Sequence, residues 1–171
     1  MAEHEKLIAD VIAAADGEIV GRIRLQKILY LLDQHGLNAD AAFHYYHYGP
    51  YSRVLDDALD RAKVFYGVKE LSRARRDGAL YSVFQSDSGS ITAVSEKIGD
   101  LYSSEAKRLI ALMKPRSATV LELAATIHWL FFFEKISAWR DELVRRKGIK
   151  TEGGRTEQAL ELLSELGLSP A

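Results

Sequence analysis

The histidines offer the most recognisable chemistry in this chain, because imidazole is a common zinc ligand. His44 and His47 lie three residues apart in an aromatic stretch. In an extended segment, residues i and i+3 point to opposite faces, so these two side chains do not converge on one ion. His128 has Glu134 beyond it but no third ligand at a recognisable spacing. We therefore interpret these histidines as structural and predict no metal site.

Nucleophilic catalysis has no better support. The chain contains no cysteine and no Gly-x-Ser-x-Gly motif. Ser52 precedes a run with helical apolar spacing, which is typical of a helix N-cap. Gly153 and Gly154 lack the preceding strand and the lysine of a phosphate-binding loop. The sequence therefore predicts a protein that is not an enzyme and needs no cofactor, with an enzyme of unknown type as a remote alternative.

The densest aromatic run is FHYYHYGPYS, residues 43–52, which holds half of the eight tyrosines. Tyrosine buries a large ring but keeps a polar hydroxyl, so this run needs a core on one side and hydrogen-bond partners on the other. Gly49 and Pro50 interrupt it, because proline fixes its own φ and moves the preceding residue out of the helical region. We expect an extended segment that ends at Tyr48, turns, and starts a helix shortly afterwards.

A second block, GRIRLQKILYLL, occupies residues 21–32. Leu25, Ile28, Leu29 and Leu32 follow the i, i+3, i+4, i+7 spacing of one helix face. The spacing predicts a helix over residues 22–34, which the next two residues, His35 and Gly36, end.

The two blocks together resemble the Panacea domain, the family of SocA-like antitoxins that also includes uncharacterised YwgA-like proteins. The matching positions are Leu25, Gln26, Lys27, Leu29 and Tyr30 in the helix and Tyr48, Gly49, Pro50, Tyr51 and Ser52 in the turn. The similarity is strongest over residues 20–66. Many members have tryptophan where this chain has Tyr46 or His47. The resemblance implies a bacterial antitoxin-like protein that binds a cognate toxin protein and neutralises it by direct contact.

The resemblance also suggests which residues meet the partner, because arginine and tyrosine are common at interface hot spots. Our hypothesis for the partner-binding residues is Arg22, Arg24, Gln26, Lys27, Tyr30, Tyr48 and Tyr51. Gly49, Pro50 and Ser52 form the structural motif and set the backbone geometry. The alternative is that Tyr45, Tyr48 and Tyr51 are core residues with satisfied hydroxyls.

Composition limits the remaining classes. The chain has 171 residues, a formal net charge of −1 and no cysteine, which fits one domain in the reducing cytoplasm. Its N-terminus does not resemble a signal peptide. The longest apolar run, WLFFF at residues 129–133, is far shorter than the ~20 residues of a membrane span. We expect no membrane partner, and both a monomer and a homodimer remain open.

A winged-helix transcriptional regulator is the alternative function. Three helices followed by a hairpin have winged-helix element order, with the third helix placed for recognition and residues 79–94 as the wing. That helix carries Asp56, Asp57 and Asp60, however, and carboxylates oppose phosphates. Basic side chains that could contact phosphate lie at Arg73, Arg75, Arg76, Arg145, Arg146 and Lys147. We expect DNA binding, if any, to be weak.

The sequence predicts an α+β domain that is mostly α-helical, with six to seven helices and one small antiparallel hairpin near residues 79–94. Helices are expected at residues 3–15, 22–34, 52–66, 95–113, 119–133, 137–147 and 156–166. Residues 68–75 form a possible third strand before a tight turn at residues 76–78. The domain covers residues 1–148, and residues 149–171 are a helical extension packed on it.

Helix ends give further detail. Ser95 and Ser137 are expected N-caps, and Thr119 and Glu122 have the spacing of a capping box. Phe65 or Tyr66 should complete the buried face of the third helix.

Overall fold

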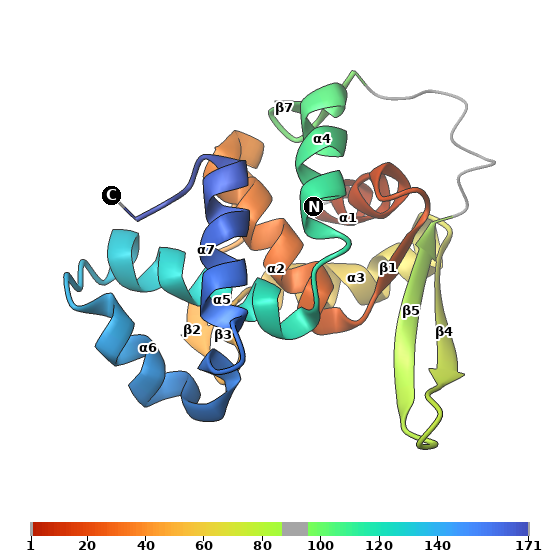
Figure 1. Ribbon diagram of the computed structural model, residues 1–171. Coiled ribbons are helices and arrows are strands. Elements are labelled where there is room, and N and C mark those ends of the chain that lie inside the picture. Colours follow the sequence, from red (N-terminus) through yellow and green to blue (C-terminus); the bar gives the residue numbers. More distant parts are fainter. Residues whose placement is uncertain (1, 87–95, 171) are drawn as a thin grey trace.

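The computed structural model describes residues 2–86 and 96–170 (Figure 1). Its α-helices are α1 (Ala2–Ala14), α2 (Arg22–Leu32), α3 (Arg53–Phe65), α4 (Ser103–Met113), α5 (Ala118–His128), α6 (Trp139–Lys147) and α7 (Arg155–Leu166). Two π-helical turns, η1 (Asp33–Leu37) and η3 (Trp129–Phe133), extend α2 and α5, and a 3-10 turn, η4 (Gly148–Thr151), follows α6. None of the described helices is both long and apolar enough to cross a membrane.

Three small antiparallel sheets accompany these helices. The largest has strand order β1-β5-β4, formed by Glu18–Val20, Leu80–Ser86 and Val68–Ala74. β2 (His44–Tyr46) pairs with β3 (Gly49–Tyr51), and β6 (Lys97–Ile98) pairs with β7 (Leu101–Tyr102). The prediction of a mostly helical α+β fold is confirmed.

The order α1, β1, α2, α3, β4, β5 is winged-helix-like, as predicted, but the wing lies earlier in the chain. β4 and β5 form the hairpin, and the tight turn between them is closed by a bond from the Arg75 N–H to the Ala79 carbonyl at 2.8 Å. The predicted strand at residues 68–75 is therefore confirmed. The return strand and turn that we expected at residues 87–94 lie outside the described residues.

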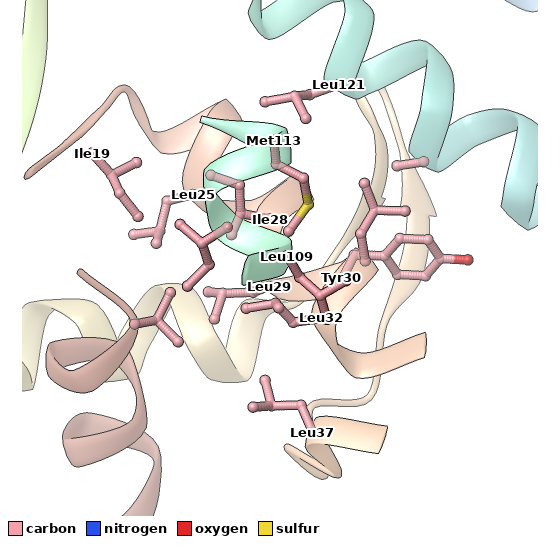
Figure 2. Close-up of a cluster of buried hydrophobic side chains, with 14 of the residues drawn as sticks. Ile19, Leu25, Ile28, Leu29, Tyr30, Leu32, Leu37, Leu109, Met113 and Leu121 are labelled. Carbon is pink, nitrogen blue, oxygen red and sulfur yellow. The ribbon is translucent and has the colours of Figure 1, made fainter. Parts of the chain in front are cut away.

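The core is built around α2, whose residues from Leu25 to Leu32 are all buried. Figure 2 shows Ile28 and Leu29 of this helix beside Leu109 and Met113 of α4. Each of residues 120–128 in α5 is buried. The prediction of a central core helix is therefore confirmed. Buried apolar residues of α1 and α7 belong to the same core.

Several predicted details were wrong. α4 begins at Ser103 rather than near residue 95, because Ile98 and Leu101 are buried as a cross-strand pair of the β6–β7 hairpin. Ser95 lies outside the described residues. Phe65 is 73% exposed and Tyr66 is also exposed, because the buried stripe of α3 ends at Ala62.

Two predicted helix caps were also wrong. Ser117, not Thr119, caps α5 by accepting a bond from the Val120 N–H at 3.1 Å. α6 starts after Ala138 without a side-chain cap, so Ser137 has no such role.

Candidate functional site

The aromatic run forms a hairpin in front of α3. His44, Tyr45 and Tyr46 of β2 pair with Tyr51, Pro50 and Gly49 of β3. The chain turns at residues 47 and 48, where the extended segment was predicted to end. Ser52 then caps α3, accepting a hydrogen bond from the Leu55 N–H at 3.1 Å, which confirms its predicted role.

Gly49 brings this hairpin against α5. Its φ of +89° is a conformation that favours glycine, and a Cβ there would lie 2.7 Å from Thr126 Oγ1. The position therefore requires glycine for both its backbone conformation and the space beside it.

Gln26 joins the two sequence blocks directly. Its amide nitrogen donates to the Ser52 carbonyl at 2.9 Å, and its amide oxygen accepts from the Ser52 N–H at 2.9 Å. Both residues are buried, so the two bonds satisfy main-chain groups that water does not reach. This pair of bonds holds the start of α3 on α2.

Lys27 makes a second link. Its ammonium donates to the Pro50 carbonyl at 2.6 Å, and its side chain is almost fully buried. Burial lowers the pKa of Lys27 to about 8, and the charges of Lys147 and Lys150 lower it while Glu122 raises it. An apolar helix face thus carries a buried cation whose hydrogen bond fixes the turn.

Glu122 of α5 is the carboxylate of this charged cluster. It lies 3.1 Å from the ammonium groups of both Lys147 and Lys150. Lys147 also donates to the His47 carbonyl at 3.2 Å, and Lys150 lies 5.0 Å from the centre of the Tyr48 ring. Together these contacts tie α5, α6 and η4 to the β2–β3 turn.

Tyr30 extends the link between α2 and α5. Its hydroxyl points away from the aliphatic cluster of Figure 2 and hydrogen bonds to His128 Nδ1 at 2.8 Å. Burial lowers the pKa of His128 to about 4, so its imidazole is neutral at pH 7. His128 is therefore a structural histidine, in agreement with our interpretation of the sequence.

Arg22 and Arg24 also make internal contacts. Arg22 lies 2.7 Å from the Asp56 carboxylate and 3.2 Å from that of Asp60. Arg24 donates to the Arg116 carbonyl at 3.1 Å. The Tyr51 hydroxyl donates to Asp56 at 2.9 Å, and burial followed by this bond raises the pKa of Tyr51 to about 12.

The structure thus separates the residues that we predicted for partner binding. Gln26, Lys27 and Tyr30 are buried, so their side chains position the hairpin and do not reach the surface. Arg22, Arg24 and Tyr51 are half-buried and engaged within the chain. Tyr48 is 52% exposed and is the member of the set that presents a large ring to solvent.

Residues that we did not predict for partner binding lie against Tyr45 of the same hairpin. Trp129 lies against Tyr45 with ring centres 6.4 Å apart and stacks on Phe133 at 4.6 Å. The Arg146 guanidinium lies 4.8 Å from the centre of the Tyr45 ring. We call Tyr45, Tyr48, Trp129, Phe133, Arg146 and Lys150 the hairpin surface.

One sequence signal could have indicated this surface. The WLFFF run has more consecutive apolar residues than one face of a helix can bury. In η3, Leu130 is buried while Phe133 is 53% exposed. The remaining contacts join residues that are far apart in the sequence, and no local pattern shows them.

Among the described residues, no three histidine or carboxylate side chains lie close enough together to hold a metal ion. His44 and His47 are exposed on the β2–β3 hairpin.

Comparison with known proteins adds one relative. No family model matches this sequence. The chain is 24% identical over 164 residues to the uncharacterized protein YwgA of Bacillus subtilis (strain 168), and the match spans 96% of each chain. That protein is itself uncharacterized, so the similarity brings no function with it, and membership of the Panacea family stays a prediction.

Proposed function

We propose that this protein is an antitoxin-like binding protein of the cytoplasm, whose hairpin surface contacts and neutralises a cognate toxin. The observation that supports the proposal is the composition of that surface, where the exposed rings of Tyr48 and Phe133 lie among the half-buried Tyr45, Trp129 and Arg146. Tyrosine, tryptophan and arginine are enriched at interface hot spots.

The hairpin itself is held in place, because Lys27 donates to its Pro50 carbonyl and Lys147 donates to its His47 carbonyl. Gln26 also binds Ser52, the residue that follows the hairpin. A preorganised surface loses little conformational freedom when it binds.

Charge suggests the character of the toxin's contact face. Residues 134–155 carry seven basic and four acidic side chains, although the whole chain has a net charge of −1. Glu142 and Glu134 are already bound to arginines of α6. The proposal therefore favours a partner whose contact face is acidic.

The test is to co-express the chain with the gene next to it in its own genome, and to score rescue of growth and co-purification. If the neighbour is toxic alone, Tyr48→Ala combined with Lys150→Glu should abolish rescue. Tyr102→Ala is the matched control for the tyrosine, because Tyr102 is 57% exposed, close to the 52% of Tyr48, but lies on β7. If a folded Tyr48/Lys150 variant still rescues growth, the hairpin surface is not the toxin-binding site. If the neighbour is harmless and does not bind, the antitoxin function is rejected.

DNA binding is the second candidate, favoured by the basic tip of the β4–β5 wing. Arg75 and Arg76 are exposed there, at the end of the hairpin. Ion pairs to Arg22 partly neutralise Asp56 and Asp60 of α3, but Asp57 remains exposed on that helix. Affinity for duplex DNA should then fall steeply between about 50 and 200 mM salt, and Arg75→Ala with Arg76→Ala should reduce that slope. Absence of binding at the lower salt concentration would reject this candidate.

A further inference from the structure

The β4–β5 hairpin extends away from the helices, with β4 on its outer side (Figure 1). β5 is the middle strand of its sheet and β4 lies at one edge. Within residues 2–86 and 96–170, no strand pairs with the outer edge of β4. Residues 69–74 are exposed along that strand. An edge of this length can accept another extended chain.

The hydrogen bonds on either side of β5 identify the backbone groups on that edge. Arg75 bonds to Ala79 across the turn, and antiparallel pairs alternate, so Lys69, Leu71 and Arg73 bond to β5. The other strand confirms the alternation, because Ser82 of β5 bonds to Gly21 beside β1. The N–H and C=O groups of Glu70, Ser72 and Ala74 therefore point outward.

The side chains beside this edge carry a specific pattern. Lys69, Leu71 and Arg73 are opposite Gln85, Val83 and Tyr81 and so share one face of the sheet. Leu71 is 38% exposed between the two cations. Arg73 lies 3.3 Å from Glu18, whereas Lys69 takes part in no ion pair found among the described residues.

On the opposite face of the sheet, the Glu70 side chain of β4 is already bonded within the chain. The Glu70 carboxylate accepts bonds from Lys63 and Ser82, both at 2.7 Å. A shallow hollow lined by Lys63, residues 68–72 and Ser82 lies along the strand. An incoming chain thus has room beside β4, and its charge preference is set by Lys69 and Arg73.

We propose that β4 is a docking edge for an extended acidic segment of a partner protein, which adds a strand to the sheet. The segment carries carboxylates on either side of an apolar residue, in the alternation that matches Lys69, Leu71 and Arg73. Its main chain pairs with Glu70, Ser72 and Ala74. The site is separate from the hairpin surface, so this inference goes beyond the proposed function and does not depend on it.

Two other occupants fit less well. A second copy paired antiparallel about Leu71 would place Lys69 directly opposite Arg73 of its partner, which is unfavourable for like charges. A nucleic acid has no alternating amide and carbonyl groups to match the outward backbone of β4.

The test uses a blocked synthetic peptide in which threonine alternates with glutamate, leucine and glutamate. Amide hydrogen exchange of the full chain is followed by NMR. At peptide concentrations about tenfold above Kd, exchange at the Glu70, Ser72 and Ala74 amides should slow about tenfold. The amides of Lys69, Leu71 and Arg73 serve as internal controls, because they are already bonded to β5.

Variants distinguish strand addition from simple charge attraction. Ser72→Pro removes an outward N–H that β5 does not use, so it should abolish peptide protection while Ser72→Ala retains it. Lys69→Glu should weaken binding at least tenfold, and Lys107→Glu on α4 is the matched charge control. If the peptide protects none of the three edge amides at millimolar concentration, or if duplex DNA alone protects them, the proposal is overturned. Equal protection in Ser72→Pro and Ser72→Ala would also overturn it.

Discussion

Gly49 is the residue where backbone conformation and close packing coincide. The carbonyl of the next residue, Pro50, accepts the hydrogen bond from Lys27. Because Gly49 has no side chain, Thr126 can pack directly against its backbone. The hairpin can therefore approach α5 only with glycine at this position.

Gly49→Ala tests that close approach. The substitution should lower the free energy of unfolding by about 2–4 kcal/mol. Alanine is strained at the positive φ of this position, and its Cβ would also lie too close to Thr126 Oγ1. Gly36→Ala is the control, since Gly36 has a φ of +97° but nothing within 4 Å of its Cβ position. It should cost about 1–2 kcal/mol. Urea denaturation measures both, and equal losses would contradict the role of Thr126.

Lys27 makes stability depend on pH in a defined direction. Its pKa is about 8 in the folded chain and 10.5 as an ordinary lysine, so between these values the unfolded state holds a proton that the folded state has lost. The free energy of unfolding therefore rises with pH across this window. Below it Lys27 is charged in both states, and the folded state bears the full cost of burying that charge.

The measurement compares the wild type with Lys27→Met. From about pH 7.5 to about pH 9.5, the wild type should gain about 2 kcal/mol in unfolding free energy relative to the variant. The unpaired Pro50 carbonyl lowers the stability of the variant by a similar amount at every pH and does not affect the slope. Parallel pH curves for the two proteins would show that Lys27 titrates normally.

At the scale of elements, α2 is the support on which the hairpin and α3 are assembled. In one turn of this helix, Gln26 hydrogen bonds to Ser52 and Lys27 to Pro50. In the next turn, Tyr30 hydrogen bonds to His128. Polar side chains in an otherwise apolar helix thus determine where its neighbours lie.

Gln26→Met tests this support. It should destabilise the fold by about 1–3 kcal/mol, because it leaves the buried Ser52 N–H without a partner. The Ser52 C=O loses its bond from Gln26 but still accepts from the Asp56 N–H at 3.1 Å. Gln34→Met is the matched control and should cost less than about 1 kcal/mol, since Gln34 is half-buried and bonds only to a carbonyl of its own helix. Chemical denaturation at one pH is sufficient. Similar losses in both variants would argue against the support.

The sequence predicted the elements better than the contacts between them. Apolar spacing located α1, α3 and α7 within about two residues, because a one-sided stripe is a local property. It misplaced the start of α4, since Ile98 and Leu101 have a spacing that a helix and a tight hairpin can both bury. The resemblance to the Panacea domain suggested that Lys27 contacts a partner, whereas Lys27 is buried and binds the Pro50 carbonyl. That carbonyl lies 23 residues away in the sequence, so no local pattern shows the contact.

At the scale of the whole molecule, one core connects the winged-helix-like half to the C-terminal helices. Residues of α1, α2, α4, α5 and α7 belong to a single buried cluster. Glu122 adds a polar connection, since it binds Lys147 of α6 and Lys150 of η4 while Lys147 reaches the β2–β3 turn. These links predict that residues 149–171 do not unfold separately from the rest of the chain.

Leu163→Ala tests that prediction on α7. Leu163 is fully buried, so its truncation should cost about 2–5 kcal/mol, and the whole domain should bear that loss. Tryptophan fluorescence reports the C-terminal half, where Trp129 and Trp139 lie, and far-UV circular dichroism reports all helices. In urea the two signals should change together in the wild type and should shift together to lower urea in the variant. If the tryptophan signal moves alone, α7 belongs to a unit that unfolds independently, and the single core does not act as one cooperative domain.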